Sequence, residues 1–281
     1  MSLDDSEAFI LNIVKNPQVF FPVYKAIALN ELKTRDEIIE STLLSESLVK
    51  ESLDFLSSLY LIEKKNDVYY ITQNSEPLEI NFKLEVINQF AIKKRDDNSW
   101  AKQAAFYLIY KYILMDEISV LDVSNRVFIE KLERWFDEIG YNPKSPKGNP
   151  IKMNREKLNN WIKLANYLGL VYEIQVNKYI KFIDPDVFYH MIKIYCEDNE
   201  NNICVIDDFI KWSNEYYLPF DQDVMKSSYE ISKPYSDVIK DLCINRLIEL
   251  DIMGNYPQYK FMDDKSEYNL LNTFNIFRVD I

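Results

Sequence analysis

The clearest pattern of apolar and polar positions lies in residues 45–72, SESLVKESLDFLSSLYLIEKKNDVYYIT. Its apolar residues recur at i, i+4, i+7 and i+11, one face of a helix: Val49, Leu53, Leu56 and Tyr60. The rhythm then changes, because two short apolar-rich runs flank Asn66-Asp67, a loop typical of a tight hairpin. The segment therefore predicts a helix followed directly by a β-hairpin.

The same pattern occurs twice more along the chain, in residues 154–184 and 235–262. The second copy has its apolar stripe at Leu158, Trp161, Ile162, Ala165 and Leu168, and its turn at Val176, Asn177 and Lys178. The third copy has Val238, Leu242, Ile248 and Leu250 before a predicted turn at Gly254, Asn255, Tyr256 and Pro257. We therefore expect three helix-and-hairpin segments.

Each copy is preceded by a long apolar helix, a short β-like run and a polar residue that opens another helix. Thr34, Ser124 and Asp207 are the predicted N-caps, since their side-chain oxygens can accept from the free amides of a first turn. The order helix, strand, helix, helix, hairpin resembles the winged-helix superfamily. The expected fold class is mainly α with small β-hairpins (α+β), arranged as tandem winged-helix units.

The predicted domains are a first unit at 1–82, a bridging helix with a second unit at 83–184, and a third unit with a C-terminal tail at 185–281. The bridging helix is expected at about 83–95, between the first two units. The stretch 140–154 holds three prolines and two glycines, which predicts an exposed loop.

The composition of the chain argues against several classes of protein and several kinds of site. No apolar run approaches the roughly 20 residues of a membrane span, and the acidic N-terminus is unlike a secretory signal, so we expect a soluble, cytoplasmic protein. The three cysteines lack CxxC spacing and the four glycines are scattered, which argues against zinc sites, disulfides and phosphate-binding loops. The one histidine, His190, lies in an apolar stretch and is expected to be structural. No metal or cofactor is expected.

Charge separates the middle of the chain from its ends. Residues 1–100 carry a formal charge of −6, residues 101–190 of +2 and residues 191–281 of −8. Between residues 144 and 163 six basic residues accompany only Glu156, and neighbouring amides can also meet phosphates or base edges. The predicted nucleic-acid-binding residues are Lys144, Lys147, Lys152, Arg155, Lys157, Asn159 and Lys163. The alternative is that these side chains only keep a loop and a helix surface solvated.

The helix within residues 45–72 is too acidic to face a polyphosphate, so we expect it to meet a protein instead. The predicted partner-binding residues are Glu46, Glu51, Asp54, Tyr69 and Tyr70. An acidic chain of tandem winged-helix units looks like the kleisin-interacting tandem winged-helix subunits of SMC-type chromosome and plasmid-defence complexes. That resemblance implies a protein partner, a DNA surface and dimerisation.

The sequence thus favours a non-enzymatic adaptor in a DNA-associated assembly. The alternative is a free-standing winged-helix transcription regulator, which would bind a defined duplex without a partner. A nuclease is not expected, because the Glu63-Lys64-Lys65 run lacks an acidic residue on a preceding strand to complete a divalent-cation site.

Overall fold

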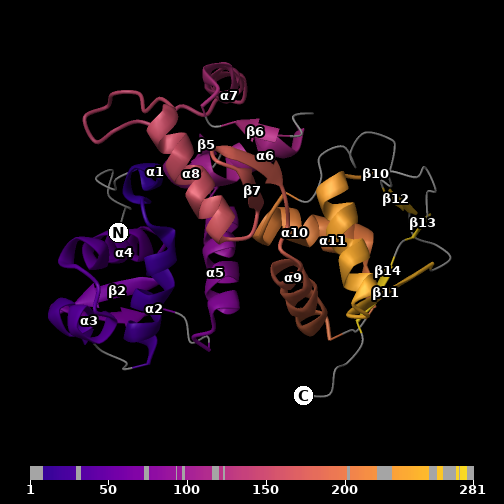
Figure 1. Ribbon diagram of the computed structural model, residues 1–281, viewed down its shortest axis with the longest axis horizontal. Coiled ribbons are helices and arrows are strands. Elements are labelled where there is room, and N and C mark those ends of the chain that lie inside the picture. The colour runs from indigo at the N-terminus through magenta and orange to yellow at the C-terminus, as the bar shows by residue number, and fades with distance from the viewer. Residues whose placement is uncertain are drawn as a thin grey trace.

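The computed structural model describes residues 9–29, 33–72, 76–92, 94–96, 99–115, 120–122, 124–200, 203–219, 230–252, 258–261, 270–271 and 273–276. Most of these residues are helical, and the strands form small sheets of two or three strands between the helices (Figure 1). The predicted mainly α, α+β class is confirmed.

The first unit begins with a short N-terminal segment, α1 (Ile10–Ile13) and the 3-10 helix η1 (Pro17–Val19). Then follow α2 (Phe20–Ala28), β1 (Lys33–Thr34), α3 (Arg35–Thr42), α4 (Glu46–Ser58), β2 (Ile62–Lys65) and β3 (Val68–Ile71). The strands form an antiparallel sheet in the order β1-β3-β2. Asn66 and Asp67 both have positive φ, 51° and 63°, as a two-residue hairpin turn requires. The predicted helix and hairpin of residues 45–72 are confirmed.

The second unit repeats this order. It contains α6 (Ala105–Met115), β6 (Val120–Asp122), α7 (Arg126–Glu138), α8 (Arg155–Tyr167), β7 (Val171–Gln175) and β8 (Lys178–Lys181). Its antiparallel sheet has the corresponding strand order, β6-β8-β7. An exposed loop, as predicted, joins α7 to α8.

The third unit has the same helices but a different hairpin from the one predicted. It contains α9 (Pro185–Asp198), β9 (Ile203–Val205), α10 (Ile206–Tyr216), α11 (Lys233–Ile244), β11 (Ile248–Asp251) and β14 (Thr273–Ile276). The predicted partner of β11 at about 258–262 was wrong, because β11 pairs with β14 in the sheet β11-β14-β9. Strand β12 (Tyr259–Phe261) instead joins β10 (Glu230–Ile231) and β13 (Leu270–Leu271) in a second small sheet. The predicted turn at residues 254–257 lies outside the described residues.

The predicted helix caps were right in one case of three. Thr34 caps α3 in a capping box, in which its hydroxyl accepts from the Glu37 amide and the Glu37 carboxylate accepts from the Thr34 amide. Ser124 is not the cap of α7, because Asn125 supplies the oxygen that accepts from the Val127 amide. Asp207 is also not a cap, because α10 already begins at Ile206 and Asp207 lies in its first turn.

The third helix of every unit ends in the same way. The second residue after the helix has a left-handed conformation, and the strand begins two residues later; these residues are Tyr60 (φ 58°), Gly169 (φ 79°) and Arg246 (φ 57°). The amide of the following leucine donates to a carbonyl five residues back: Leu61 to Leu56, Leu170 to Ala165 and Leu247 to Leu242. This is the Schellman arrangement, and it turns the chain from helix to strand. The repeated spelling, a leucine followed by Ile or Val after the left-handed residue, is visible in the sequence.

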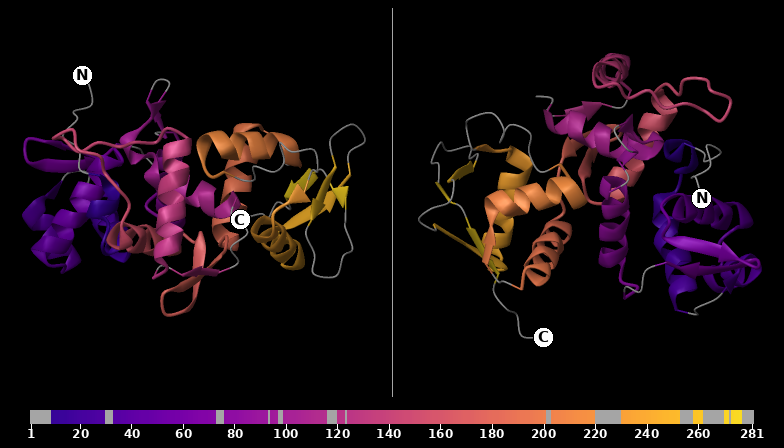
Figure 2. Two further views of the ribbon diagram at one scale, coloured as in Figure 1. Left: turned by 90° about the horizontal axis from the view of Figure 1, so that it is seen from above. Right: turned by 180° about the vertical axis from the view of Figure 1, so that it is seen from behind.

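Helix α5 (Glu79–Ile92) stands between the units (Figures 1 and 2). Near its start, Phe82 packs against Tyr24 of α2, with ring centroids 5.0 Å apart. Near its end, Phe90 stacks on Phe106 of α6 at 4.3 Å. The same helix contacts α9 and α10. The predicted bridging helix thus begins and ends a few residues earlier than expected and contacts the third unit as well as the first two. A small hairpin of β4 (Arg95–Asp96) and β5 (Ser99–Trp100) and the 3-10 helix η2 (Lys102–Ala104) lead from it into α6.

Glycine is needed after α8 but not after α11. Replacing Gly169 by alanine should destabilise the protein by more than about 1–2 kcal/mol, the usual cost of a left-handed non-glycine residue. The excess arises because an added Cβ would lie 2.5 Å from the Cβ of Asp184. Gly140→Ala is the matched control, since Gly140 has φ +73° but open space around a Cβ. Arg246→Gly should stabilise by about 0.5 kcal/mol, because it relieves φ strain but frees the unfolded chain. Urea unfolding measures all three, and equal losses for Gly140→Ala and Gly169→Ala would contradict the close approach.

The packing of α5 predicts a large loss for one buried ring and a small one for its neighbour. Phe90→Ala should lower the free energy of unfolding by about 3–5 kcal/mol, because it removes the stack on Phe106 and leaves a cavity. Ile92→Ala, at the end of the same helix where Ile92 is 46% exposed, should cost about 1 kcal/mol or less. Chemical denaturation followed by circular dichroism provides both values, and a similar loss for the two variants would show that α5 is not held by its buried face.

Candidate nucleic-acid interface

The basic segment of the second unit is built on an ordered loop and the first turns of α8. The loop folds back on itself, because the Ser145 amide donates to the Asn149 carbonyl and the Ile151 amide donates to the Pro143 carbonyl, both at 2.8 Å. It is anchored to α7 by the Met153 amide, which donates to a Glu133 carboxylate oxygen at 2.6 Å. Lys144, Lys147 and Lys152 on this loop are exposed, as is Arg155 at the start of α8, and Lys157 is half-buried. The structure therefore brings most of the predicted basic residues to one end of the unit.

These cations lack intramolecular partners that neutralise them. Among the described residues, none of the six basic side chains between 144 and 163 forms an ion pair. Basic residues elsewhere are paired in many cases, such as Lys50 with Asp54 at 2.8 Å and Arg126 with Glu130 at 2.9 Å. The positive charge of this segment is consequently available to an external anion.

The hairpin of the second unit adds a cation that the sequence reading missed. Lys178, at the tip of the β7–β8 hairpin, is exposed and stands opposite Asp122 of β6 in the sheet register. Hydrogen bonds from Ser124 lower the pKa of the Asp122 carboxyl, and the positive charges of Lys178 and Arg155 lower it further. Both cations are therefore near Asp122, so the hairpin tip and the start of α8 belong to one basic surface. We define this basic surface as Lys144, Lys147, Lys152, Arg155, Lys157 and Lys178.

The middle of α8 contacts the N-terminal segment, although Asn159 and Lys163 in this part of the helix were predicted to bind nucleic acid. The Asn160 side chain is buried, and its amide nitrogen donates to the Leu11 carbonyl at 2.8 Å. The Lys163 ammonium reaches the Lys15 carbonyl at 3.2 Å. Asn159 is half-buried, and its side-chain oxygen accepts no hydrogen bond from the residues that the structure describes. Asn159 and Lys163 thus lie beside the contact between α8 and the N-terminal segment, and we do not include them in the basic surface.

Residues 10–19 also contact α4, so this segment lies between the third helices of the first and second units. Glu51 of α4 receives the amides of Lys15 and Asn16, each at 2.7 Å, and the Asn16 side chain at 3.0 Å. The Glu51 carboxylate, predicted to bind a partner, therefore has a structural role in holding the segment.

The other predicted partner-binding residues remain near the surface of the first unit. Glu46 is paired with Arg35 at 3.1 Å, and Asp54 with Lys50. Tyr69 and Tyr70 are half-buried, and lysine ammonium groups of the same hairpin lie 5.6 and 4.8 Å from their ring centroids. The structure brings these side chains to one unit, but their charges and ring faces already have local neighbours.

An exposed apolar strip on β7 was also missed by sequence reasoning. Tyr172, Ile174 and Val176 are 56%, 49% and 78% exposed, and β7 is an edge strand of its sheet. Apolar residues that alternate with polar ones, here Glu173 and Gln175, usually face the core of an antiparallel sheet, so the sequence pattern alone does not reveal that this apolar set is exposed.

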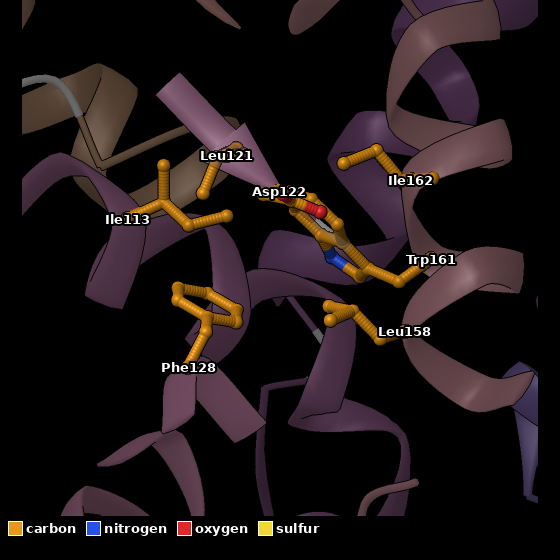
Figure 3. Close-up of a pocket in the computed structure, with 7 residues that line it drawn as sticks. All are labelled: Ile113, Leu121, Asp122, Phe128, Leu158, Trp161 and Ile162. Carbon is orange, nitrogen blue, oxygen red and sulfur yellow. The ribbon is translucent and has the colours of Figure 1, made fainter. Parts of the chain in front are cut away.

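The interior of the second unit is packed, with no ligand cavity at its centre. Figure 3 shows seven side chains from α6, β6, α7 and α8 that converge there: Ile113, Leu121, Asp122, Phe128, Leu158, Trp161 and Ile162. The Trp161 indole nitrogen donates to the Phe106 carbonyl at 3.0 Å, and the space between the side chains is too small for a water molecule. In the described part of the chain, no three His, Cys, Asp or Glu side chains gather as metal ligands would.

No family model, curated protein or solved structure matches the chain. Among the described helices, none has the length and apolar character needed to cross a membrane.

The contacts of Glu51 predict that it matters for stability more than its neighbours on α4. Glu51→Ala should cost about 1–3 kcal/mol, because it leaves the Lys15 and Asn16 amides without their acceptor. Glu46→Ala should change stability by only about 0.5 kcal/mol, since the Glu46 side chain is 73% exposed. Hydrogen exchange should also accelerate at Lys15 and Asn16 in the Glu51 variant alone. Unchanged exchange at these two amides would show that the segment is held without Glu51.

Proposed function

We propose that the three units are winged-helix domains and that the protein is a non-enzymatic adaptor in a DNA-associated assembly. The proposal is supported by the element order, which is helix, strand, helix, helix, strand, strand in the first two units; the third has the same helices in the same order, with additional strands around α11. It is supported further by the equivalent sheet orders, in which the last strand lies between the other two, and by the shared ending of the third helices. A winged helix uses its third helix and its hairpin to meet partners.

The observation that carries the proposed DNA contact is the basic surface of the second unit, whose cations form no ion pair with the described residues. Its cations come from the loop, the first turns of the third helix and the hairpin tip. A duplex attracts such a surface because each bound cation releases condensed counterions from the phosphates. The first and third stretches of the chain are acidic, with formal charges of −6 and −8, so contact is restricted to the middle of the protein.

The contacts of α8 favour backbone binding over the reading of a base sequence. Sequence-specific winged helices lay the third helix in the major groove with polar side chains aimed at base edges. In α8, Asn160 is used to hold Leu11 and Lys163 reaches Lys15. Because these two side chains make intramolecular hydrogen bonds, the adaptor is favoured over a free-standing transcription regulator. The acidic first unit and the apolar strip on β7 are the surfaces we assign to protein partners.

The proposal makes a quantitative prediction for salt dependence. Replacing Lys152, Arg155 and Lys178 together by glutamine should flatten the plot of log K against log salt by about two to three units, because each phosphate contact contributes a slope of roughly −0.9. Fluorescence anisotropy with a random-sequence duplex over a salt series measures the slope. Circular dichroism verifies that the variant folds.

The control removes the same charge from the first unit. Lys50, Lys64 and Lys65 replaced together by glutamine should leave the slope within about half a unit of the original, because these lysines are paired with acids of their own helix or hairpin. Equal slopes for both triple variants, or no duplex binding by the unaltered protein, would refute the DNA contact.

A further inference from the structure

A hollow of about 340 Å³ opens between helices α5, α9 and α10, away from the basic surface. It is lined by Asn88, Asp198, Asn199, Trp212, Tyr216 and Tyr217. Figure 1 shows these three helices meeting near the centre of the molecule. Nothing in the fold or in the proposed DNA contact accounts for it.

Aromatic rings form one wall of this hollow. The rings of Trp212 and Tyr217 are 4.8 Å apart and tilted by 36°, and the Tyr216 ring is 6.4 Å from Trp212. The Trp212 ring also packs against the rings of Phe209 and Tyr195, whose centroids are 5.7 and 5.4 Å from its own. Tyr216 is 40% exposed and Trp212 is half-buried, so ring surface remains open to solvent. A rigid, partly exposed tryptophan with neighbouring tyrosines presents electron-rich faces to a ligand.

Two carboxylates, Asp198 and Glu85, lie near these rings. Asp198 is exposed at the last residue of α9, and among the described residues it forms no ion pair, whereas its neighbour Glu197 is paired with Lys193. The pKa of the Tyr217 hydroxyl is raised by burial and then by the negative charges of Glu85 and Asp198, so both carboxylates are near this ring. The C-terminal end of α9 adds the partial negative charge of the helix dipole, which makes an unpaired carboxylate unfavourable there. An unfavourable placement of this kind marks a functional position when nothing inside the molecule compensates it.

Lys94 and Asn88 contact the C-terminal end of α10 beside the hollow. The Lys94 ammonium donates to the carbonyls of Asn214 and Glu215, at 2.7 and 3.0 Å, and lies 4.6 Å from the Tyr107 ring. Asn88 donates to the Tyr216 carbonyl at 2.9 Å. These hydrogen bonds are accepted by carbonyls at the end of α10. Among the described residues, none that line the hollow is basic.

We propose that this hollow binds an arginine side chain of a partner protein. The Trp212 and Tyr216 rings are tilted by 47°, so a planar guanidinium group can stack on one of them and remain close to the other, while its N–H groups donate to the Asp198 carboxylate in the plane of the guanidinium. An ammonium group is a compact, strongly hydrated point charge and cannot do both in this way. The inference does not rest on DNA contact, because the two sites share no residue.

The test uses the whole protein and a tripeptide with one cationic side chain, acetyl-Gly-Arg-Gly-amide. Matched peptides carry lysine, or citrulline as the neutral isostere of arginine. In a 15N-labelled sample the four tryptophan indoles report separately, and only that of Trp212 should shift, with a dissociation constant on the order of millimolar. Citrulline should cause no shift, and lysine should bind about threefold or more weakly.

Variants of the lining complete the test. Tyr216→Leu should weaken arginine binding by about threefold or more, the lower end expected for loss of a cation–π contact. Asp198→Asn should weaken it by about two- to fivefold. Glu197→Gln removes the same charge from the neighbouring residue and should leave the affinity within about twofold. An unmoved Trp212 indole, equal binding of the three peptides, or equal effects of Asp198→Asn and Glu197→Gln would overturn the proposal. None of these results would alter the salt slope on DNA.

Discussion

The arrangement of the molecule depends on the burial of α5. This helix buries Phe82, Leu84, Val86, Ile87, Gln89, Phe90 and Ala91, which fall on more than one side of a helix. A helix that is apolar on most sides is stable only when other elements cover it, and here each unit covers part of it. The three units therefore share a core through α5, and moving one of them away would expose apolar surface on the others.

This shared core explains how charge is distributed. Each unit packs one face against α5, so the units differ in the surfaces that they expose. The second unit exposes the basic surface and the first exposes acidic residues. The aromatic hollow with its nearby carboxylates lies beside the third. The N-terminal segment adds a second tie, because Glu51 and Asn160 hold it from the third helices of two units. The third helices of the first two units are thus partly used as structural supports. Separate outward surfaces on one shared core are consistent with the adaptor proposed above.

Local patterns were predicted well and non-local ones were not. The α4 stripe and the Asn66-Asp67 turn are set by neighbouring residues, so the sequence alone indicated them. The pairing of β11 with β14 joins residues more than 20 positions apart, and turn residues between them led to a nearer but wrong partner. The contact of residues 10–16 with α4 and α8 carries no periodic signal, so the structural role of Glu51 was missed. Lys178 was read as a turn residue, and only the sheet register brings it towards Arg155 through Asp122. The aromatic hollow was missed for the same reason, since its residues come from three helices.

The bond between Asn160 and Leu11 spans 149 positions of the chain, and this has a consequence for how the protein is made. Residues 10–16 leave the ribosome before either of their supports: Glu51 follows Asn16 by 35 positions, whereas Asn160 of α8 follows Leu11 by 149 positions. Closing so long a loop costs only slightly more entropy than closing a shorter one. The contact with α8 is therefore formed later than the contact with Glu51, but its loop-closure cost is similar. Before α8 is synthesised, the N-terminal segment can contact only α4. The apolar side chains of α1 that α8 covers in the folded protein are therefore exposed in the nascent chain for that time.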